Sequence, residues 1–294
     1  MKYFIFLLIF TKSIFIYANT ENDKDLLNKQ NSPVQNEAPG FWDGEWYFSW
    51  GYNRDYWRPS DIHISQKALG NDFTIYNVRA EDFPQWNSGV FNKELTEPQF
   101  NVRIGHFFDK ERTWGLELNY DHTKYSTYID QYARVSGTIN GNYTDSIQLL
   151  TYDYFHYNLH NGANHVMINL VKRIPILFET NENFSLAGII KAGAGVMLPH
   201  SENKVLGNTN YVGSKEWGNL FGVKNGWWQL NGWTVGIEAG FRFVVWNPIY
   251  IEFTDKEAYA SLINIPVYQG VADQVLWMNE LILSLGYTLD TLKD

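Results

Sequence analysis

The stretch Trp233-Thr-Val-Gly-Ile-Glu-Ala-Gly-Phe-Arg-Phe243 alternates strictly between apolar residues and residues that are small, polar or charged. Side chains on a β-strand point alternately to its two faces. One face of this strand is therefore apolar from Trp233 to Phe243, whereas the other face carries Glu238 and Arg242. A strand with this pattern is typical of a sheet that separates an apolar phase from a polar interior.

Strand character of this kind recurs along most of the chain, which has 294 residues. Runs of aromatic and β-branched residues with a period of two indicate half-buried strands. The segments with this character are residues 45–53, 98–108, 114–125, 165–176, 184–198, 230–246, 249–265 and 275–289.

The connections between these segments alternate in length. The short ones are residues 109–113, 177–183 and 247–248, and the long ones are residues 54–97, 126–164 and 199–229. Short turns at one end and long loops at the other are typical of outer-membrane β-barrels. We therefore predict an all-β fold, a closed antiparallel up-and-down transmembrane barrel of about eight strands. Residues 60–65 and 71–79 also alternate and predict a β-hairpin above the membrane; counted as membrane strands, they would make ten.

The composition excludes several classes of protein. The net charge of −9 argues against nucleic acid as a partner, because phosphates require a basic surface. The chain has no cysteine, so disulfides, thiolate catalysis and zinc–thiolate sites are excluded. Aromatic residues make up 17% and charged residues only 19%, and apolar character is dispersed rather than gathered into helical spans.

The N-terminus predicts export. Residues 1–18 resemble a signal peptide, with Lys2 followed by the apolar run 3–10; a short membrane anchor is the alternative. Residues 19–40 are polar and predict a disordered leader. Residues 41–294 are assigned to the barrel.

The block Gly51-Tyr-Asn-Arg-Asp-Tyr-Trp57, followed by residues 60–63 and 71–82, looks like one that recurs in uncharacterised outer-membrane proteins. With the strand pattern over residues 44–289, the chain resembles the small outer-membrane barrels of Gram-negative bacteria, of the OmpA or OmpW type. The resemblance implies location in the bacterial outer membrane and contact with its lipid and lipopolysaccharide. It carries no activity with it.

The C-terminus bears on assembly. Leu285-Gly-Tyr-Thr-Leu289 resembles the terminal signal that the barrel-assembly machinery recognises, although residues 290–294 follow it. The resemblance therefore implies the barrel-assembly machinery as a partner, although the additional residues 290–294 depart from the usual terminal signal.

Strand phase points a set of charged residues toward the barrel interior. Buried charges require partners, so we expect a lumen filled by ion pairs; a narrow ion or solute pathway is the alternative. The predicted network consists of Glu45, Arg103, Glu117, Asp121, Lys191, Glu238, Arg242, Glu252, Lys256 and Glu280.

Tryptophans mark the ends of several predicted strands. Trp46, Trp114, Trp233 and Trp246 are expected to form interfacial girdles at the membrane surface. Further tryptophans in the third long loop, at positions 217, 227 and 228, could instead build a carbohydrate-binding platform.

Two groups of residues suggest chemistry, each with a simpler explanation. His156, His160 and His165 have no carboxylate within their cluster, so we interpret them as solvated loop residues rather than metal ligands. Asp61 and His63 are residue types of a hydrolase and lie near Ser60 and Ser65. However, same-face neighbours on a strand lie roughly 7 Å apart, too far for direct proton transfer.

His200-Ser201-Glu202 is an equally generic combination of residue types. We therefore predict no catalytic site, cofactor or metal. The predicted role is structural or one of surface interaction. The alternatives are a small porin or apolar-solute transporter and, second, a lipid A-modifying enzyme. The surface partner is unknown.

Overall fold

The computed structural model describes residues 43–85, 95–109, 111–159, 162–178, 183–210 and 229–291. The chain divides into two units, Met1–Pro39 and Gly40–Asp294, and all described residues belong to the second. The predicted signal peptide (1–18) and leader (19–40) lie outside the described residues. In the described ranges, no helix has the length and apolar character needed to span a membrane.

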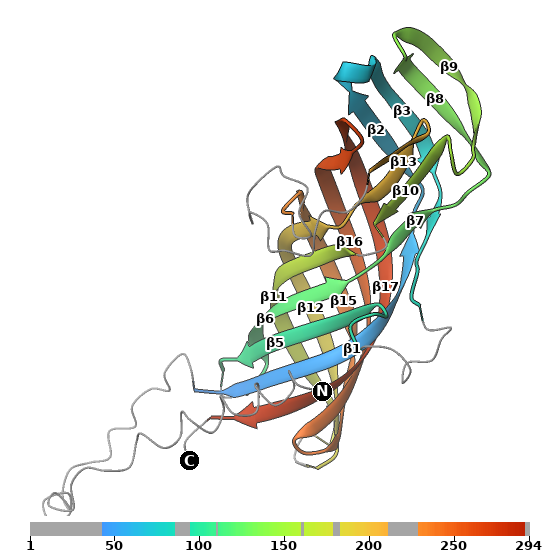
Figure 1. The fold of residues 1–294 in the computed structure, drawn as a ribbon. Helices are drawn as coiled ribbons and strands as arrows, with labels where there is room; N and C mark the ends of the chain where they lie inside the picture. Colours follow the sequence, from blue (N-terminus) through green and yellow to red (C-terminus); the bar gives the residue numbers. More distant parts are fainter. Residues whose placement is uncertain are drawn as a thin grey trace, which may run out of the picture. The chain divides into compact units, whose positions relative to one another are not determined.

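Eight antiparallel strands form a ring of pairings (Figure 1). Each strand pairs with two others, and the last pairing, between β17 and β1, completes the circuit. The ring strands, in order, are β1 (Glu45–Trp57), β5 (Phe100–Phe107), β6 (Trp114–His122), β11 (Ala163–Leu177), β12 (Ser185–Pro199), β15 (Gly232–Trp246), β16 (Ile249–Val267) and β17 (Gly270–Asp290). The predicted antiparallel all-β fold is confirmed, and the eight predicted segments coincide with these strands.

The same sheet continues beyond the ring. The upper part of β17 pairs with β2 (Ser60–Gln66), and the sheet then adds β3 (Asn71–Val78), β8 (Gln131–Ile139) and β9 (Asn142–Leu150). The predicted hairpin at residues 60–65 and 71–79 is therefore confirmed as β2 and β3, and it lies outside the ring of eight.

A second sheet accompanies these added strands. Its order is β14 (Asn208–Asn210), β13 (Glu202–Val205), β10 (Phe155–Leu159), β7 (Tyr125–Thr127) and β4 (Ala80–Glu81). We call these five strands and β2, β3, β8 and β9 the extension. Long stretches expected to be loops, 126–164 and 199–229, thus contain several strands. One cause is the Asn140-Gly141 turn, whose positive φ values of 50° and 77° suit a two-residue hairpin.

The extension has an apolar core. Ile62, Ile64, Phe73, Val135 and Tyr157 are each at most 1% exposed and belong to one buried cluster. The cluster also includes residues from the upper parts of β16 and β17, so the extension and the ring share strands and packing. Burial of this apolar surface gives the extension the arrangement of a protein folded in water.

The sidedness of the sheet inverts along the long strands. On β16, the outward residues change from Ile251 and Phe253 to Asp255 and Glu257. Over the same length, the buried inward residues change from charged Glu252 and Lys256 to Ala258, Ala260 and Leu262. The same change occurs on β17, where outward Leu285 and Leu283 give way to Asn279, and inward Glu280 gives way to Met278 and Leu276. The ring is therefore apolar outside and polar inside, whereas the extension is the reverse.

Two tyrosine–glycine pairs stabilise the interior of the ring at the end that carries the short turns, called here the turn end. Tyr47 lies opposite Gly105 on the neighbouring strand, and Tyr250 lies opposite Gly286. A Cβ atom at Gly105 would lie 2.1 Å from Cζ of Tyr47, and one at Gly286 would lie 2.0 Å from Cζ of Tyr250. Each aromatic ring therefore covers the backbone of a glycine, which no other residue could replace without displacing that ring.

Gly105→Ala should lower stability, because the added methyl group must displace the buried Tyr47 ring. Overpacking of this kind costs about 1–3 kcal/mol. The measurement is urea unfolding of the protein in detergent micelles, followed by tryptophan fluorescence. Gly188→Ala is the matched control, since its Cβ would meet no atom closer than 3.6 Å. An unchanged midpoint for Gly105→Ala would contradict this packing.

The turn after β5 is organised by one carboxylate. Asp109 accepts hydrogen bonds from the backbone N–H groups of Thr113 and Trp114, at 2.8 and 2.7 Å, and from the Thr113 hydroxyl at 2.6 Å. Partial burial raises the pKa of Asp109, but these hydrogen bonds outweigh it and leave the pKa below its ordinary value. The ionised form is thus favoured in the folded protein.

The Asp109 contribution to stability should depend on pH. A lowered pKa in the folded state means that the stabilisation is present above the pKa of the unfolded chain and is lost as pH falls through the folded pKa. Asp109→Asn should therefore destabilise by about 1 kcal/mol at pH 7 and by less at pH 3. Urea midpoints of both proteins at the two pH values provide the measurement, and an equal difference at both would contradict the assignment.

Candidate functional site

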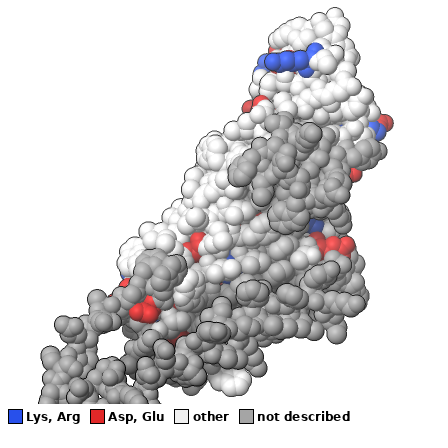
Figure 2. All heavy atoms as spheres, turned by 60° about the vertical axis from the view of Figure 1, so that its left-hand side comes forward, with Lys and Arg blue, Asp and Glu red and all other residues white. Residues whose placement is uncertain are grey.

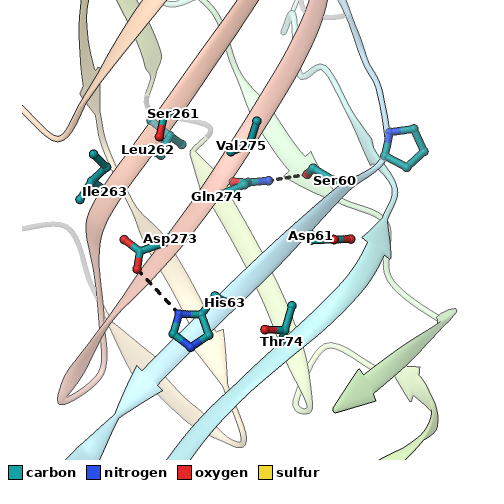
Figure 3. A pocket seen from close by; sticks show the side chains of 11 residues that line it. Ser60, Asp61, His63, Thr74, Ser261, Leu262, Ile263, Asp273, Gln274 and Val275 are labelled. Carbon is teal, nitrogen blue, oxygen red and sulfur yellow. Dashed lines mark hydrogen bonds and ion pairs between the residues drawn. The ribbon is translucent and has the colours of Figure 1, made fainter. Parts of the chain in front are cut away.

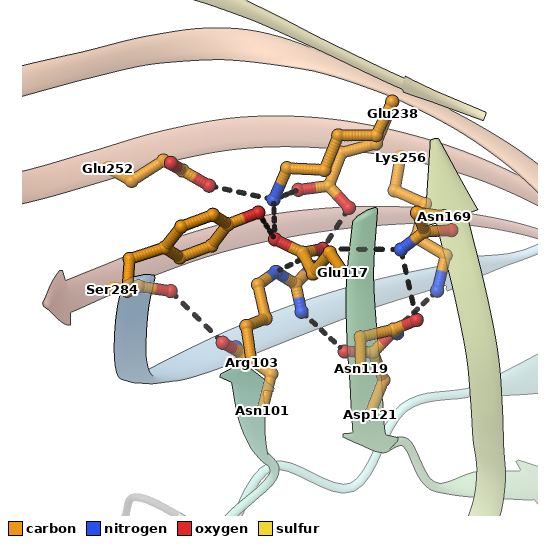
Figure 4. A network of polar contacts seen from close by, with 12 residues as sticks. Asn101, Arg103, Glu117, Asn119, Asp121, Asn169, Glu238, Glu252, Lys256 and Ser284 are labelled. Carbon is orange, nitrogen blue, oxygen red and sulfur yellow. Dashed lines mark hydrogen bonds and ion pairs between the residues drawn. The ribbon is translucent and has the colours of Figure 1, made fainter. Parts of the chain in front are cut away.

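The ten charged residues predicted to face inward are all buried inside the ring, and none is more than 6% exposed. They come from seven of the eight strands, because each strand contributes alternate residues to the interior. Figure 4 shows the central part of the network, where side chains from opposite walls of the ring meet. We call this set, with the polar residues that contact it, the charge network.

Arg103 is one of its two central cations. Its Nη1 lies 2.8 Å from Oδ1 of Asp121, and its Nη2 lies 3.0 Å from Oε2 of Glu238. Its Nε lies 3.8 Å from Oε1 of Glu117. Arg103 on β5 thus connects β6 with β15, which lies across the ring.

Lys191 is the other central cation. Its Nζ lies 2.8 Å from Oε1 of Glu252, 3.0 Å from Oε2 of Glu117 and 3.1 Å from Oε1 of Glu238. These carboxylates belong to β16, β6 and β15, so a single ammonium group ties together four strands. Three acceptors match the three N–H donors of a lysine.

Neutral polar side chains complete the centre of the network. Asn169 donates to Oε1 of Glu117 at 3.2 Å and to Oδ1 of Asn119 at 3.1 Å. The Tyr47 hydroxyl donates to Oε2 of Glu117 at 2.9 Å. Hydrogen bonds of this kind are what make buried charges tolerable, because they replace the water that the charges have lost.

The network continues toward the extension through Lys256. Its ammonium group contacts Asp121 and lies 3.5 Å from Oε2 of Glu280. Glu280 is fully buried, and its carboxylate oxygens accept no hydrogen bond from the described residues. Lys256 is therefore the cation that compensates this carboxylate.

Arg242 organises the turn end of the network. Its guanidinium contacts Glu252 at 2.7 Å. It also lies over the rings of Tyr47 and Tyr250, at 4.3 and 4.1 Å from their centroids. The two tyrosines pack with Phe107, Val171 and Ile189 in a small buried cluster. An arginine between aromatic faces gains cation–π attraction. Together with the two tyrosines, Arg242 also occupies the cross-section of the ring at this end.

Arg173 is a charged residue of the interior that was missed from the sequence, and Asp55, buried opposite Glu280 in the β1–β17 pairing, is another. Arg173 on β11 donates to Oε1 of Glu45 at 2.9 Å. It is in phase with His165, Asn169 and Val171, which all face inward, so the period of two contained the signal. The predicted strand 165–176 includes Arg173, but the predicted set of inward charged residues does not.

The predicted interfacial tryptophans lie on the outside of the ring. Trp114, Trp233 and Trp246 are 42%, 45% and 70% exposed, and Trp46 is partly buried by stacking on His106. The third-loop tryptophans at positions 217, 227 and 228 lie outside the described residues. The carbohydrate platform considered for that loop therefore stays a prediction.

The histidines singled out from the sequence occupy separate environments. His156 on β10 contacts Asn158, whereas His165 inside the ring contacts the Thr234 hydroxyl at 3.0 Å. His160 lies outside the described residues. Within the part of the chain that the structure describes, no group of three or more His, Asp or Glu side chains is arranged to hold a metal ion.

The hydrolase-like residues do not form a triad. The Ser60 side chain is buried and hydrogen bonds to Gln274, whereas His63 is on the opposite face of the strand. His63 contacts two carboxylates, with Nε2 2.9 Å from Asp72 and Nδ1 3.7 Å from Asp273. Ser65 lies opposite Asp72 in the β2–β3 pairing, and the structure gives it no contact with His63. His200 and Ser201 are buried, and the Ser201 hydroxyl donates to the Pro266 carbonyl.

Lys191→Met should be strongly destabilising, because three buried carboxylates would lose their shared cation. Removing one partner from a buried pair costs about 3–5 kcal/mol. The control is Arg134→Gln, which breaks an exposed bidentate pair with Asp145 and should change stability little, because solvent screens such a pair. Urea midpoints in micelles would compare the two, and equal losses would contradict the central place of Lys191.

No family model and no curated protein matches the chain. Similar solved structures include Ail of Yersinia pestis in complex with the heparin analogue sucrose octasulfate, with 14% identity, 84% of this chain and 99% of that chain covered, and a TM-score of 0.30. OprG from Pseudomonas aeruginosa has 14% identity, 85% and 98% coverage and a TM-score of 0.37. AlkL in lipid bilayers has 12% identity, 90% and 99% coverage and a TM-score of 0.36.

At these identities and TM-scores the likeness carries no argument about ligand or activity. OprG and AlkL are outer-membrane proteins, and Ail is described as one in a further matching structure.

Proposed function

We propose that the eight-strand ring is a closed β-barrel that spans the bacterial outer membrane, with the extension on the external side. The inversion of sidedness along β16 and β17 carries this proposal. A sheet in lipid needs apolar side chains outside, whereas a sheet in water needs them in its core. The boundary between the two arrangements lies near Asp255 and Asn279.

The outer surface of the ring supports the membrane assignment. Leu285, Ile237 and Ile168 are 61%, 65% and 64% exposed, and they belong to a set that extends around the ring. Each such side chain contributes about 1.5–3 kcal/mol when it is buried. Figure 2 shows that most of the described surface on one face is free of charged side chains. Exposed apolar surface of this extent marks contact with a membrane or a partner.

Polar and aromatic side chains gather at the proposed outer boundary. Trp277 donates its indole N–H to Glu257 at 2.6 Å, and the Arg58 guanidinium lies 4.3 Å from the Trp277 ring centroid. Tyr259 packs against both Trp233 and Trp277. Amphipathic rings with hydrogen-bonded polar ends suit the headgroup region, where lipid and lipopolysaccharide would be the partners.

The proposed role is structural and one of surface interaction, without enzymatic activity. The charge network and the aromatic cluster at the turn end fill the interior, which favours an anchor over an open channel. The extension presents folded β-structure to the outside, where a surface partner would meet it. Insertion would use the barrel-assembly machinery, as the signal at residues 285–289 implies.

Single cysteines test the topology, because the natural chain has none. Asn142→Cys at the tip of the extension should react with a membrane-impermeant maleimide on intact cells. Glu111→Cys, in the turn at the opposite end, should react only after permeabilisation. Both positions are exposed, so accessibility reports the side of the membrane.

Fractionation on the same cells gives an independent measurement. The protein should appear in the outer membrane and migrate differently with and without heating on a detergent gel. Labelling of Glu111→Cys on intact cells, or a soluble periplasmic protein without a heat-dependent shift, would overturn the proposal.

Planar bilayers test whether the interior is blocked. The natural protein should give no steady single-channel openings, because the ion pairs and the Arg242 cluster occupy the cross-section. The double variant Arg242→Ser/Tyr250→Ala should conduct, whereas Lys172→Ser on the outer face should not. Reproducible openings of the natural protein would favour the small porin or solute transporter instead.

The absence of enzymatic activity is tested on the lipid itself. Mass spectrometry of lipid A from cells with and without the protein should give identical profiles. The contacts of His63 with two aspartates, rather than with a serine hydroxyl, support this expectation. A changed acyl pattern that depends on the protein would establish the lipid-modifying alternative.

A further inference from the structure

A pocket of about 580 Å³ opens on the outward face of the sheet where β1 gives way to β2. Figure 3 shows side chains from β2, β3, β16 and β17 around it. The polar residues that line it include Ser60, Asp61, His63, Thr74, Asp273 and Gln274. Its volume is in the range of small-molecule sites in proteins.

Two β-bulges place the carboxylates of this pocket. Asp61 on β2 lies opposite a bulge in β3, and its Oδ1 accepts the backbone N–H of Asn77 at 2.8 Å. Asp273 on β17 lies opposite a bulge in β16, and its Oδ1 accepts the backbone N–H of Asn264 at 2.8 Å. On both sides of the pocket, therefore, a backbone N–H of a bulge donates a hydrogen bond to a pocket aspartate.

Both bulge residues adopt a costly conformation. Asn77 and Asn264 have φ values of 56° and 55°, in the left-handed region that non-glycine residues rarely adopt. Each of these conformations orients a backbone N–H toward an aspartate that lines the pocket. Each aspartate therefore has one oxygen fixed by the main chain, which orients the carboxylate before any ligand arrives.

His63 lies on β2, two residues after Asp61 and between the neighbouring strands β17 and β3. It is paired in register with Asp273 on one side and with Thr74 on the other. Its Nδ1 lies 3.7 Å from Oδ2 of Asp273. The imidazole and the Thr74 hydroxyl add groups that can both donate and accept hydrogen bonds.

A buried amide at the pocket has unused hydrogen-bonding capacity. Gln274 is 3% exposed, and its Nε2 donates to Ser60 at 2.8 Å and to the Tyr125 hydroxyl at 2.9 Å. Its Oε1 accepts no hydrogen bond from the described residues. Gln274 is in phase with the buried residues Ala272 and Leu276, so its side chain closes the inner side of the pocket and supports Ser60 rather than meeting a ligand.

The charge of the pocket selects among ligands. The lining includes two aspartates but, within the described residues, neither lysine nor arginine. Phosphate, sulfate and uronate groups would therefore be repelled. Pro59, Leu262 and Val275 supply an apolar wall beside these acceptors. Oriented carboxylates and a hydroxyl next to a small apolar surface suit a ring that carries hydroxyl or amine donors on its edge and C–H groups on its face.

We infer that this pocket binds a saccharide, a pyranoside rich in hydroxyl or amine donors and without acidic substituents. Asp61 and Asp273 would accept its hydroxyl or amine hydrogens, and the Thr74 hydroxyl would meet a further polar group. The inference concerns the extension alone and holds whether or not the ring conducts. Binding by the purified protein and its location in the cell are measured separately.

Titration calorimetry of the full chain tests the inference, in micelles of a detergent that has no sugar headgroup. The probes are the glucosamine disaccharide, its N-acetylated form and a sulfated, uronate-containing heparin disaccharide. The first two should bind and the third should not. Asp61→Asn and Asp273→Asn should each weaken binding tenfold or more.

The variants are chosen to keep the fold. Asparagine retains the Oδ1 acceptor that the bulge N–H groups require, and only the charge is lost. Asp145→Asn is the matched control, because Asp145 is an exposed aspartate of the extension that does not line the pocket. Unchanged heat-dependent migration on gels would show that all three variants fold.

Several results would overturn the inference. They are no binding of either glucosamine probe, equal binding by Asp61→Asn, Asp273→Asn and the natural protein, or preferential binding of the sulfated disaccharide. Loss of binding in Asp145→Asn as well would also overturn it, because the effect would then not belong to the pocket.

Discussion

Charges that are removed from water must find partners inside the protein, and this constraint organises the ring. Lys191 meets three carboxylates and Arg103 meets three, so that each acid of the centre is shared between cations. So many ions can lose their water only because each one contacts several ions of opposite charge. Asn169 and Tyr47 add hydrogen bonds to these contacts. Removing any one cation would leave the carboxylates that it contacts buried with only part of their compensation.

The same strands serve two environments. The strand β16 changes from apolar residues outward to apolar residues inward within the stretch Ile249 to Leu262, over which its register with β17 is unbroken. The inversion requires no change in backbone geometry, because the period of two is kept and only the residue types on each face exchange. Continuity of the backbone then holds the extension in register with the ring, so the pocket at β2 and β17 is built on the same sheet as the charge network.

Much of the ring could be predicted from the sequence, since a strict period of two leaves little freedom. In residues 233–243 every side chain faces the side that its polarity indicates. The identity of each ion-pair partner could not be predicted, because it depends on contacts across the ring between strands far apart in sequence. Arg103 and Glu238, for instance, are 135 residues apart.

The extension was predicted only in part. The β2–β3 hairpin followed from alternation, and the Asn140-Gly141 dipeptide was a hairpin signal that the prediction did not use. The strands β10, β13 and β14 are only three to five residues long, too short for periodicity to distinguish them from loops. The bulges at Asn77 and Asn264 are tertiary features, because each is stabilised by an aspartate on another strand.

The pairing of β1 with β17 has a consequence for biogenesis. The first and last strands of the ring must meet across more than two hundred residues, from Tyr47 opposite Thr288 to Trp57 opposite Met278. Until β1 and β17 pair, charged side chains such as Arg103 on β5 and Glu238 on β15 have no enclosed interior in which to contact each other. In the proposed membrane location, a partly assembled sheet would therefore expose unpaired charged side chains to the acyl chains of the lipid. Under the proposed membrane location, insertion and closure of the ring would therefore have to occur together.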